Sequence, residues 1–289
     1  MRLFLRRITA SFALLVGISG ASGALAACGL DEEACTTENG SYHIVLPEDA
    51  GESVPAILFV HGFGSSGEGV LRNSGLVNAV LGRGYALIAP NGLVRPGREQ
   101  RSWSFHPQLA QQRDEVAFLT AVRDDAARRY GIDGNRTILA GFSIGGSMTS
   151  YLACAQPDAF PAYAPVGGGF WRPHPEGCAG PVNLLHTHGW TDGTVPLEGR
   201  VLRGSSLDDP GALAQGDIFH TMLLWREVNG CQNLKADEFA MSERFWQRWW
   251  TNCTEGKALQ LALFPSGHRM PNGWTDMTVD WFESLQATE

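Results

Sequence analysis

The stretch Arg136-Thr-Ile-Leu-Ala-Gly-Phe-Ser-Ile-Gly-Gly146 decides the predicted fold. Its first part, up to Phe142, is an apolar run typical of a buried strand in a parallel sheet. Residues 145–155 follow with the pattern of a helix. A serine between such a strand and helix fits G-x-S-x-G, in which a sharp turn lifts the hydroxyl clear of the sheet. We therefore predict that Ser143 is a nucleophile, the alternative being a tight glycine turn with an incidental serine.

Strands and helices alternate along the rest of the chain. Apolar runs predict further strands at 42–46, 56–60, 85–89, 162–167, 182–188 and 259–264. Helical spacing is found over 70–81, 114–130, 217–228 and 277–285. This alternation predicts an α/β fold with a mostly parallel sheet and helices on both faces. We expect one domain over residues 27–289, with the Gly-, Pro- and Asp-rich segment 190–216 as an insertion or lid-side loop.

The N-terminus has the pattern of an export signal over residues 1–26. Arg2, Arg6 and Arg7 precede a mostly apolar run, and Ala24-Leu25-Ala26 resembles a cleavage site. The apolar run is shorter than a comfortable bilayer span. The sequence therefore predicts a secreted or periplasmic protein without a membrane span, and an N-terminal membrane anchor is the alternative.

The cysteines support the same compartment. There are six of them, an even number, and an exported chain meets oxidising conditions. We predict three local disulfides, although sequence alone leaves the connectivity open: Cys28–Cys35, Cys154–Cys178 and Cys231–Cys253. Leu25-Ala26-Ala27-Cys28 also resembles a lipobox, so a lipoprotein anchored through Cys28 is the alternative. No Cys/His spacing suggests zinc, and no metal or organic cofactor is implied.

The charge balance limits the partners. The formal net charge is −8, and removal of the three leader arginines would make the chain more acidic. An acidic protein without a basic run does not suit a nucleic-acid backbone as its main partner. The expected partner is a small or polymeric substrate.

A serine nucleophile needs a base, and His268 is the best candidate. It lies in the loop after the last predicted strand and before the final helix, where the chain order Ser, acid, His places the base. The other histidines are weaker candidates for that place in the order: His61 before a glycine turn, His186 and His188 at a strand end, and His43, His106, His174 and His220 without a motif.

The acid that orients the imidazole is predicted to be Asp192. It follows the strand at 182–188, and therefore lies at the carboxyl edge of the sheet, where active sites of open α/β sheets gather. Asp208, Asp209 and Asp217 are the alternatives.

A tetrahedral intermediate needs two aligned N–H donors. We expect the amide of Ile144 and the amide of Phe63, with Gly64 as the alternative to Phe63. Aromatic residues flank the same loops, and we predict that Trp103, Trp171 and Trp190 shape a substrate pocket, the alternative being that they are simply packed.

With these motifs identified, the chain resembles the polyhydroxybutyrate depolymerase/feruloyl esterase group of secreted α/β-hydrolases. The resemblance rests on the following segments: Val60-His-Gly-Phe63, Asp114-Glu-Val-Ala-Phe-Leu119, Tyr130-Gly-Ile-Asp133, Gly141 to Gly146, His188-Gly-Trp-Thr-Asp192 with Val195-Pro196, and Gly267-His268 with Pro271. It implies the same Ser143, Asp192 and His268 triad and the same oxyanion donors. The stretch from Trp225 through Asn229-Gly-Cys231 to Cys253 also resembles a disulfide-bearing segment of these esterases. Trp190 and Arg269-Met270 depart from the group's usual residues beside the triad.

The predicted activity is hydrolysis of carboxylic esters through an acyl-enzyme. The resemblance implies polyhydroxybutyrate-type oligomers or short polyesters as substrates, or alternatively feruloyl or acetylxylan esters of plant cell walls. A peptidase on the same scaffold and a non-catalytic binding protein with the same fold are the remaining possibilities.

Overall fold

The computed structural model describes residues 26–28, 33–109, 111–202, 206, 208–209 and 211–287. The predicted leader therefore lies outside the described residues, apart from Ala26. Within the described part, eleven strands form one sheet. Its six central strands are parallel and run in the order β5 (Ala86–Pro90), β4 (Val54–Val60), β8 (Ile132–Phe142), β9 (Ala162–Val166), β11 (Leu184–Gly189) and β16 (Leu259–Phe264). The predicted parallel sheet is thus confirmed in its centre.

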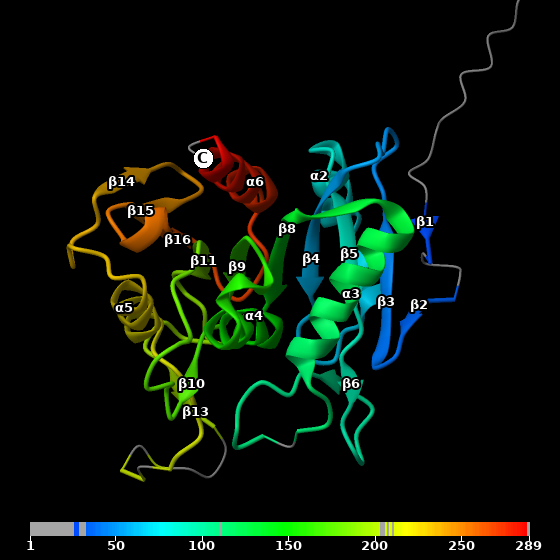
Figure 1. The fold of residues 1–289 in the computed structure, drawn as a ribbon. Helices are drawn as coiled ribbons and strands as arrows, with labels where there is room; N and C mark the ends of the chain where they lie inside the picture. Colours follow the sequence, from blue (N-terminus) through cyan, green and yellow to red (C-terminus); the bar gives the residue numbers. More distant parts are fainter. Residues whose placement is uncertain are drawn as a thin grey trace, which may run out of the picture.

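Antiparallel strands extend both edges of this parallel centre, at opposite sides of the molecule (Figure 1). One edge carries β3 (Gly40–Val45), which pairs with β5, together with β1 (Ala26–Ala27) and β2 (Cys35–Thr37). The other edge carries β15 (Trp246–Trp250), paired with β16, and β14 (Glu238–Met241). β14 and β15 were not predicted from the sequence.

Alternation along the central strands divides the core into two layers. In β4, Leu58 and Val60 pack on one face, whereas Ile57 and Phe59 pack on the other. Successive side chains of a strand point to opposite faces, so a strand that is buried on both sides reads as continuously apolar. The first face is covered by α3 (Glu115–Tyr130), α4 (Ile144–Ala155) and α5 (Ile218–Val228), and the second by α1 (Gly67–Leu71), α2 (Ser74–Gly82) and α6 (Trp274–Gln286).

The helix predicted over 70–81 is wrong in one respect, because the structure has two helices there. The chain leaves α1 at Arg72, and the side chain of Asn73 accepts a hydrogen bond from the Leu76 amide at 3.2 Å. An asparagine that satisfies a free amide in this way starts a new helix. By contrast, Asp114 and Asp217 cap α3 and α5 at the predicted starts.

Short strands outside the main sheet shape the loops. The predicted insertion 190–216 contributes two of them to a small sheet, which consists of β10 (Trp171–Arg172), β13 (Ala214–Gln215) and β12 (Arg200–Val201). A second pair is formed by β6 (Leu93–Val94) and β7 (Arg101–Ser102), and the 3₁₀ turns are η1 (Pro157–Ala159) and η2 (Thr254–Gly256).

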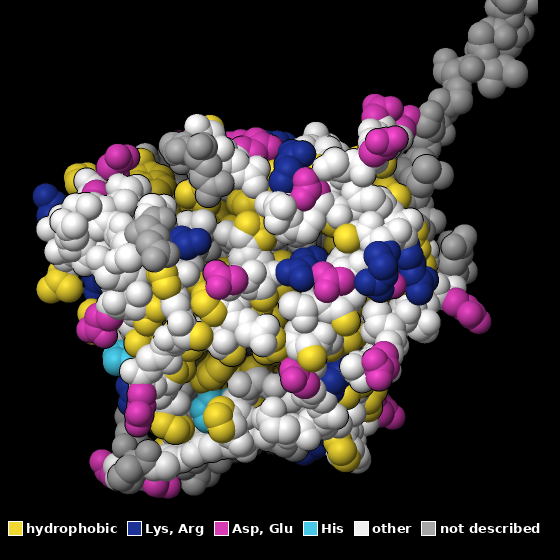
Figure 2. All heavy atoms as spheres, in the orientation of Figure 1, with side chains coloured by type: hydrophobic (Ala, Val, Ile, Leu, Met, Phe, Trp, Pro, Cys, Tyr) yellow, Lys and Arg dark blue, Asp and Glu magenta, His cyan; other side chains and the backbone are white. Residues whose placement is uncertain are grey.

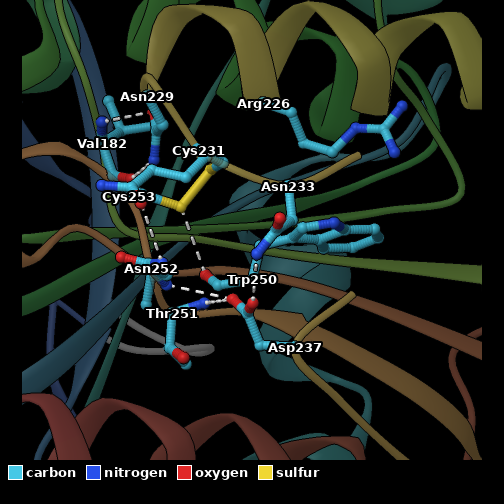
Figure 3. The surroundings of a disulfide bond; sticks show 12 residues. Val182, Arg226, Asn229, Cys231, Asn233, Asp237, Trp250, Thr251, Asn252 and Cys253 are labelled. Atoms are coloured by element: carbon cyan, nitrogen blue, oxygen red, sulfur yellow. Dashed lines mark hydrogen bonds between the residues drawn. A yellow bond between two sulfur atoms is a disulfide. The ribbon is translucent and has the colours of Figure 1, made fainter. Parts of the chain in front are cut away.

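All three predicted disulfides are present in the structure: Cys28–Cys35, Cys154–Cys178 and Cys231–Cys253. The last one ties the end of α5 to the segment after β15 (Figure 3). Beside it, the Asn229 side chain bonds both backbone groups of Val182 at 3.0 and 2.7 Å, so the start of β11 is attached to the same junction. Pairing of Cys28 with Cys35 uses the sulfur that a lipid anchor would require.

On the face shown in Figure 2, acidic and basic side chains are interspersed, and the basic ones do not merge into one broad patch. Among the helices of the described residues, none has both the length and the apolar character that crossing a bilayer demands.

Candidate active site

Ser143 occupies the tight turn between β8 and α4. Its backbone has φ 60° and ψ −123°, a conformation that non-glycine residues rarely adopt. The Ser143 amide donates to the Val166 carbonyl at 2.8 Å, and the Ser147 amide donates to the Ser143 carbonyl at 3.0 Å. These bonds hold the strained turn between two strands and a helix, as functional turns of this kind require.

The glycines around Ser143 are there because the backbones approach closely. A Cβ at Gly145 would overlap the Val60 carbonyl, and one at Gly141 would overlap the Gly145 carbonyl. A Cβ at Gly146 would lie 2.8 Å from the Val166 carbonyl oxygen. The motif therefore reflects the packing of α4 against β4 and β9 as well as the turn itself.

His268 joins the serine to Asp192. Its Nε2 lies 2.8 Å from the Ser143 hydroxyl, and its Nδ1 lies 2.7 Å from Asp192 Oδ2. The ring packs against Phe142, with 4.7 Å between ring centroids. Since a carboxylate only accepts hydrogen bonds, Nδ1 carries the proton and Nε2 is free to accept one from the serine. The three side chains come from the loops after β8, β11 and β16. The sheet brings them together, although His268 is 125 residues from Ser143 and 76 residues from Asp192 in the sequence.

Asp192 is fixed by its own loop. Its Oδ1 accepts hydrogen bonds from the amides of Thr194 and Val195, both at 2.8 Å. The residue is 5% exposed. One carboxylate oxygen is thus occupied by the backbone, and the other faces His268.

Two buried histidines of β11, His186 and His188, lie beside the Asp192 loop. His188 Nε2 lies 2.8 Å from the Val195 carbonyl and therefore donates to it, and His188 Nδ1 lies 3.1 Å from His186 Nε2. Burial lowers the pKa of both rings below the ordinary value, so they are neutral at neutral pH. From the sequence, His186 and His188 were only weaker candidates for the base. In the structure, His188 bonds to the Asp192 loop and His186 bonds to His188.

The weaker candidates for the base and the acid have partners of their own, away from the triad. His43 contacts the Cys28 carbonyl, His106 contacts the Pro173 carbonyl, and His174 stacks on His220. Asp217 caps α5 by accepting from the His220 amide, and Asp209 accepts from the Gly211 amide. Asp208 accepts from the Ser206 hydroxyl in the same loop. None of these side chains bonds to His268 or Ser143 in the described structure.

Two amides near the nucleophile have no backbone acceptor: that of Ile144, the residue after Ser143, and that of Phe63, which lines the same cavity as Ser143. Within the described residues, neither the Phe63 nor the Ile144 N–H donates to another backbone group. The Gly64 amide, in contrast, donates to the Arg101 carbonyl at 2.9 Å and is therefore occupied. The sequence left open whether Phe63 or Gly64 is the second oxyanion donor, and the free amide favours Phe63.

A cavity of about 450 Å³ opens onto Ser143 and His268. Its apolar walls are formed by Phe63, Val70, Leu76, Phe142 and Met270. Of these, Phe63 was predicted from the sequence only as an oxyanion donor, and Met270, two residues after His268, was noted only as a departure from the related esterases.

The three predicted pocket tryptophans do not line this cavity. Trp103 is 2% exposed and donates its indole N–H to the His61 carbonyl. Trp171 donates to the Ser147 hydroxyl within the core. Trp190 is exposed, and it packs against Trp246 of β15 rather than over Ser143. Trp103 and Trp171 are therefore core residues, and Trp190 lies on the surface beside β15.

The model of the phospholipase/carboxylesterase family matches residues 40–222, which is more than half of the chain and includes Ser143 and Asp192. The chain belongs to this family. The matched region ends before His268, so the contact of His268 with the other two residues rests on the geometry above.

Individual proteins that are similar to this chain are named as esterases. It is 33% identical over 153 residues to the putative esterase NocK of Nocardia uniformis subsp. tsuyamanensis, a match that covers 51% of this chain and only 43% of NocK. It is 27% identical over 239 residues to a probable feruloyl esterase C of Aspergillus niger, covering 78% and 75% of the two chains.

The fold agrees with a solved structure. Acetyl xylan esterase from Aspergillus awamori superposes with a TM-score of 0.63 at 15% identity, over 90% of this chain and 99% of that one. This likeness supports the α/β-hydrolase fold. The feruloyl-esterase part of the predicted resemblance is confirmed, whereas its polyhydroxybutyrate depolymerase part stays a prediction.

Proposed function

We propose that this chain is a secreted serine esterase in which Ser143 is the nucleophile, His268 the general base and Asp192 the orienting acid. The observation that carries the proposal is the aligned pair of contacts, 2.8 Å from Ser143 to His268 and 2.7 Å from His268 to Asp192. A non-catalytic binding protein has no need for a strained serine turn aligned with both partners.

In the proposed mechanism, Ser143 Oγ attacks the ester carbonyl while His268 Nε2 takes its proton. The carbonyl oxygen becomes an oxyanion that accepts hydrogen bonds from the Phe63 and Ile144 amides. His268 then gives the proton to the leaving alcohol, and the acyl group stays on Ser143. A water molecule, deprotonated by His268, attacks the acyl-enzyme, and the carboxylic acid leaves.

We propose esters of hydroxycinnamic acids or of acetylated plant polysaccharide as the substrates. The apolar cavity beside Ser143 has room for an aromatic acyl group, and two similar proteins are named as a feruloyl and an acetyl xylan esterase. Polyhydroxybutyrate oligomers are the second candidate, which rests on the sequence motifs. We further propose that residues 27–289 act as one catalytic domain after removal of the leader, in an oxidising compartment that suits three disulfides.

Labelling with a fluorophosphonate tests the mechanism. Wild-type protein should be labelled at one site and S143A should not. S147A is the matched control, because Ser147 lies one turn further along α4 and is buried at 2% exposure. Labelling of folded S143A to the wild-type level would contradict the nucleophile assignment.

A hydrolysis panel then addresses the substrate. It compares methyl ferulate, acetylated xylan, hydroxybutyrate oligomers and p-nitrophenyl acetate at equal enzyme concentration. Higher kcat/KM for the feruloyl or acetyl esters than for the oligomers is expected. Preference for the oligomers by tenfold or more would reverse the order of the two candidates.

A further inference from the structure

His61 directly follows β4 and precedes the turn that contains the Phe63 amide. We propose that His61 is a positioning residue that aims the Phe63 N–H at the oxyanion by holding the carbonyl of the same peptide group. The inference rests on the proposed function, because it concerns a residue that acts through one of the proposed oxyanion donors. His61 itself contacts neither Ser143 nor His268 in the described structure.

The two ring nitrogens of His61 have fixed roles. The Gly92 amide donates to Nε2 at 3.0 Å, and Nδ1 lies 2.7 Å from the Gly62 carbonyl oxygen. A backbone N–H only donates, so Nε2 must be the acceptor. A neutral imidazole has one N–H, which is then on Nδ1 and donates to Gly62. Gly92 therefore sets the tautomer that holds the Gly62 carbonyl.

That carbonyl belongs to the peptide group whose nitrogen is the Phe63 amide. In a planar trans peptide, the C=O and the N–H point in opposite directions. A carbonyl directed at the buried His61 ring therefore directs the Phe63 N–H away from it. Phe63, Ser143 and His268 line the same cavity, and a Cβ built on Gly62 lies 3.5 Å from the Ser143 Cβ. The proposal places this N–H on the nucleophile's side of the turn.

The surroundings keep the ring in place. His61 is 1% exposed, and its ring packs on Trp103 with 4.9 Å between centroids. The Trp103 indole donates to the His61 carbonyl at 2.9 Å, and Arg101 donates to the Gly92 carbonyl at 2.9 Å. A Cβ at Gly92 would come within 3.1 Å of His61 Nε2, so the Gly92 backbone lies close against the ring. A held carbonyl also polarises its peptide group and strengthens the N–H as a donor.

Two substitutions separate this role from simple packing. In H61N, the amide nitrogen stands near the place of Nδ1 and can still donate to Gly62, while the bond from Gly92 is lost. In H61Q, the amide oxygen reaches the place of Nε2 and can still accept from Gly92, while the bond to Gly62 is lost. Each variant loses one hydrogen bond of the His61 ring. In H61Q the Gly62 carbonyl keeps the bond from the Ser65 amide at 3.2 Å, whereas in H61N the buried Gly92 amide loses its acceptor, so H61N should cost at least as much stability as H61Q.

Their effects on catalysis should differ. Loss of an oxyanion donor lowers kcat about 100- to 1000-fold. A donor that is present but no longer aimed should lower it less, so we expect kcat of H61Q to fall about 10- to 100-fold with KM within about threefold of wild type. H61N should keep kcat within about tenfold. Thermal unfolding, hydrolysis of p-nitrophenyl acetate and the rate of fluorophosphonate labelling are measured on all three proteins.

Failure of the His61 proposal can be distinguished from failure of the proposed function. If wild type is not labelled, or S143A is, the proposed function fails. If wild type is active and H61Q matches it, or if both variants lose kcat equally, the inference is overturned and the proposed function stands. Should H61Q not fold, folded H61N decides: kcat within tenfold of wild type supports the inference, and a larger loss overturns it.

Discussion

The substitution D192N probes the proposed triad most directly, because the structure dictates how the new amide must sit. Oδ1 of Asp192 accepts from the amides of Thr194 and Val195, both at 2.8 Å. The amide oxygen of the variant must take this place, since an NH₂ group there would face two donors. The NH₂ group then faces His268 Nδ1, which has to accept rather than donate.

This reversal predicts the size of the loss. With Nδ1 as the acceptor, the His268 proton moves to Nε2, which can no longer accept the Ser143 proton. The same inversion of the imidazole in a Ser-His-Asp site lowers kcat about 10⁴-fold, or about 5.5 kcal/mol of barrier. Because the backbone bonds to the loop persist, folding should change little.

We would measure kcat/KM on p-nitrophenyl acetate and the melting temperature of D192N. D217N is the matched control, since it replaces an aspartate that only caps α5 and that asparagine can replace as a cap. D217N should stay within about threefold of wild type. Folded D192N with activity within tenfold of wild type would refute the proposed role of Asp192.

Three further predictions concern stability. Replacing Gly145 by alanine forces a Cβ into the Val60 carbonyl, so G145A should lose about 3 kcal/mol of unfolding free energy; urea unfolding checks this, and an unchanged midpoint would contradict the close packing. Loss of the Cys231–Cys253 bond, which spans 22 residues, should cost about 3 kcal/mol in a double serine variant while activity at low temperature persists; a loss of both together would contradict the separation of this junction from the triad. Burial, with Arg101 and Arg113 nearby, lowers the pKa of His61 from 6.5 to about 4. As the pH drops from about 6.5 to 4, the unfolded chain therefore binds a proton that the folded chain does not, and the free energy of unfolding falls by up to about 3 kcal/mol from His61. Denaturation midpoints across this pH range should fall less in H61N than in wild type.

The sequence predicted those parts of the fold in which local pattern and tertiary environment agree. The strand at 259–264 and the helix after Asp114 have the predicted bounds, because one is buried on both faces and the other is capped and amphipathic. The hairpin of β14 and β15 was missed. Its first strand is exposed throughout, so no burial pattern marks it, and its pairing depends on the β16 edge.

Ser143, Asp192 and His268 were predictable because their order and their places after strands are fixed by the sheet. The cavity walls were not. Val70 and Leu76 lie on α1 and α2, and the break between these helices at Asn73 decides which faces reach Ser143. Trp103 and Trp171 show the opposite error, since a large aromatic residue close in sequence to a functional loop is as readily part of the core.

The position of His268 has a consequence for the newly synthesised chain. Ser143 and Asp192 precede β16 in the chain, whereas the imidazole belongs to the loop after β16, the last strand in chain order. Under the proposed mechanism, a nascent chain that is still emerging during synthesis or export carries an inert hydroxyl at Ser143. Ester hydrolysis would begin only when this strand and the loop after it have docked, so the onset of activity would report that the carboxyl-terminal part of the sheet has formed.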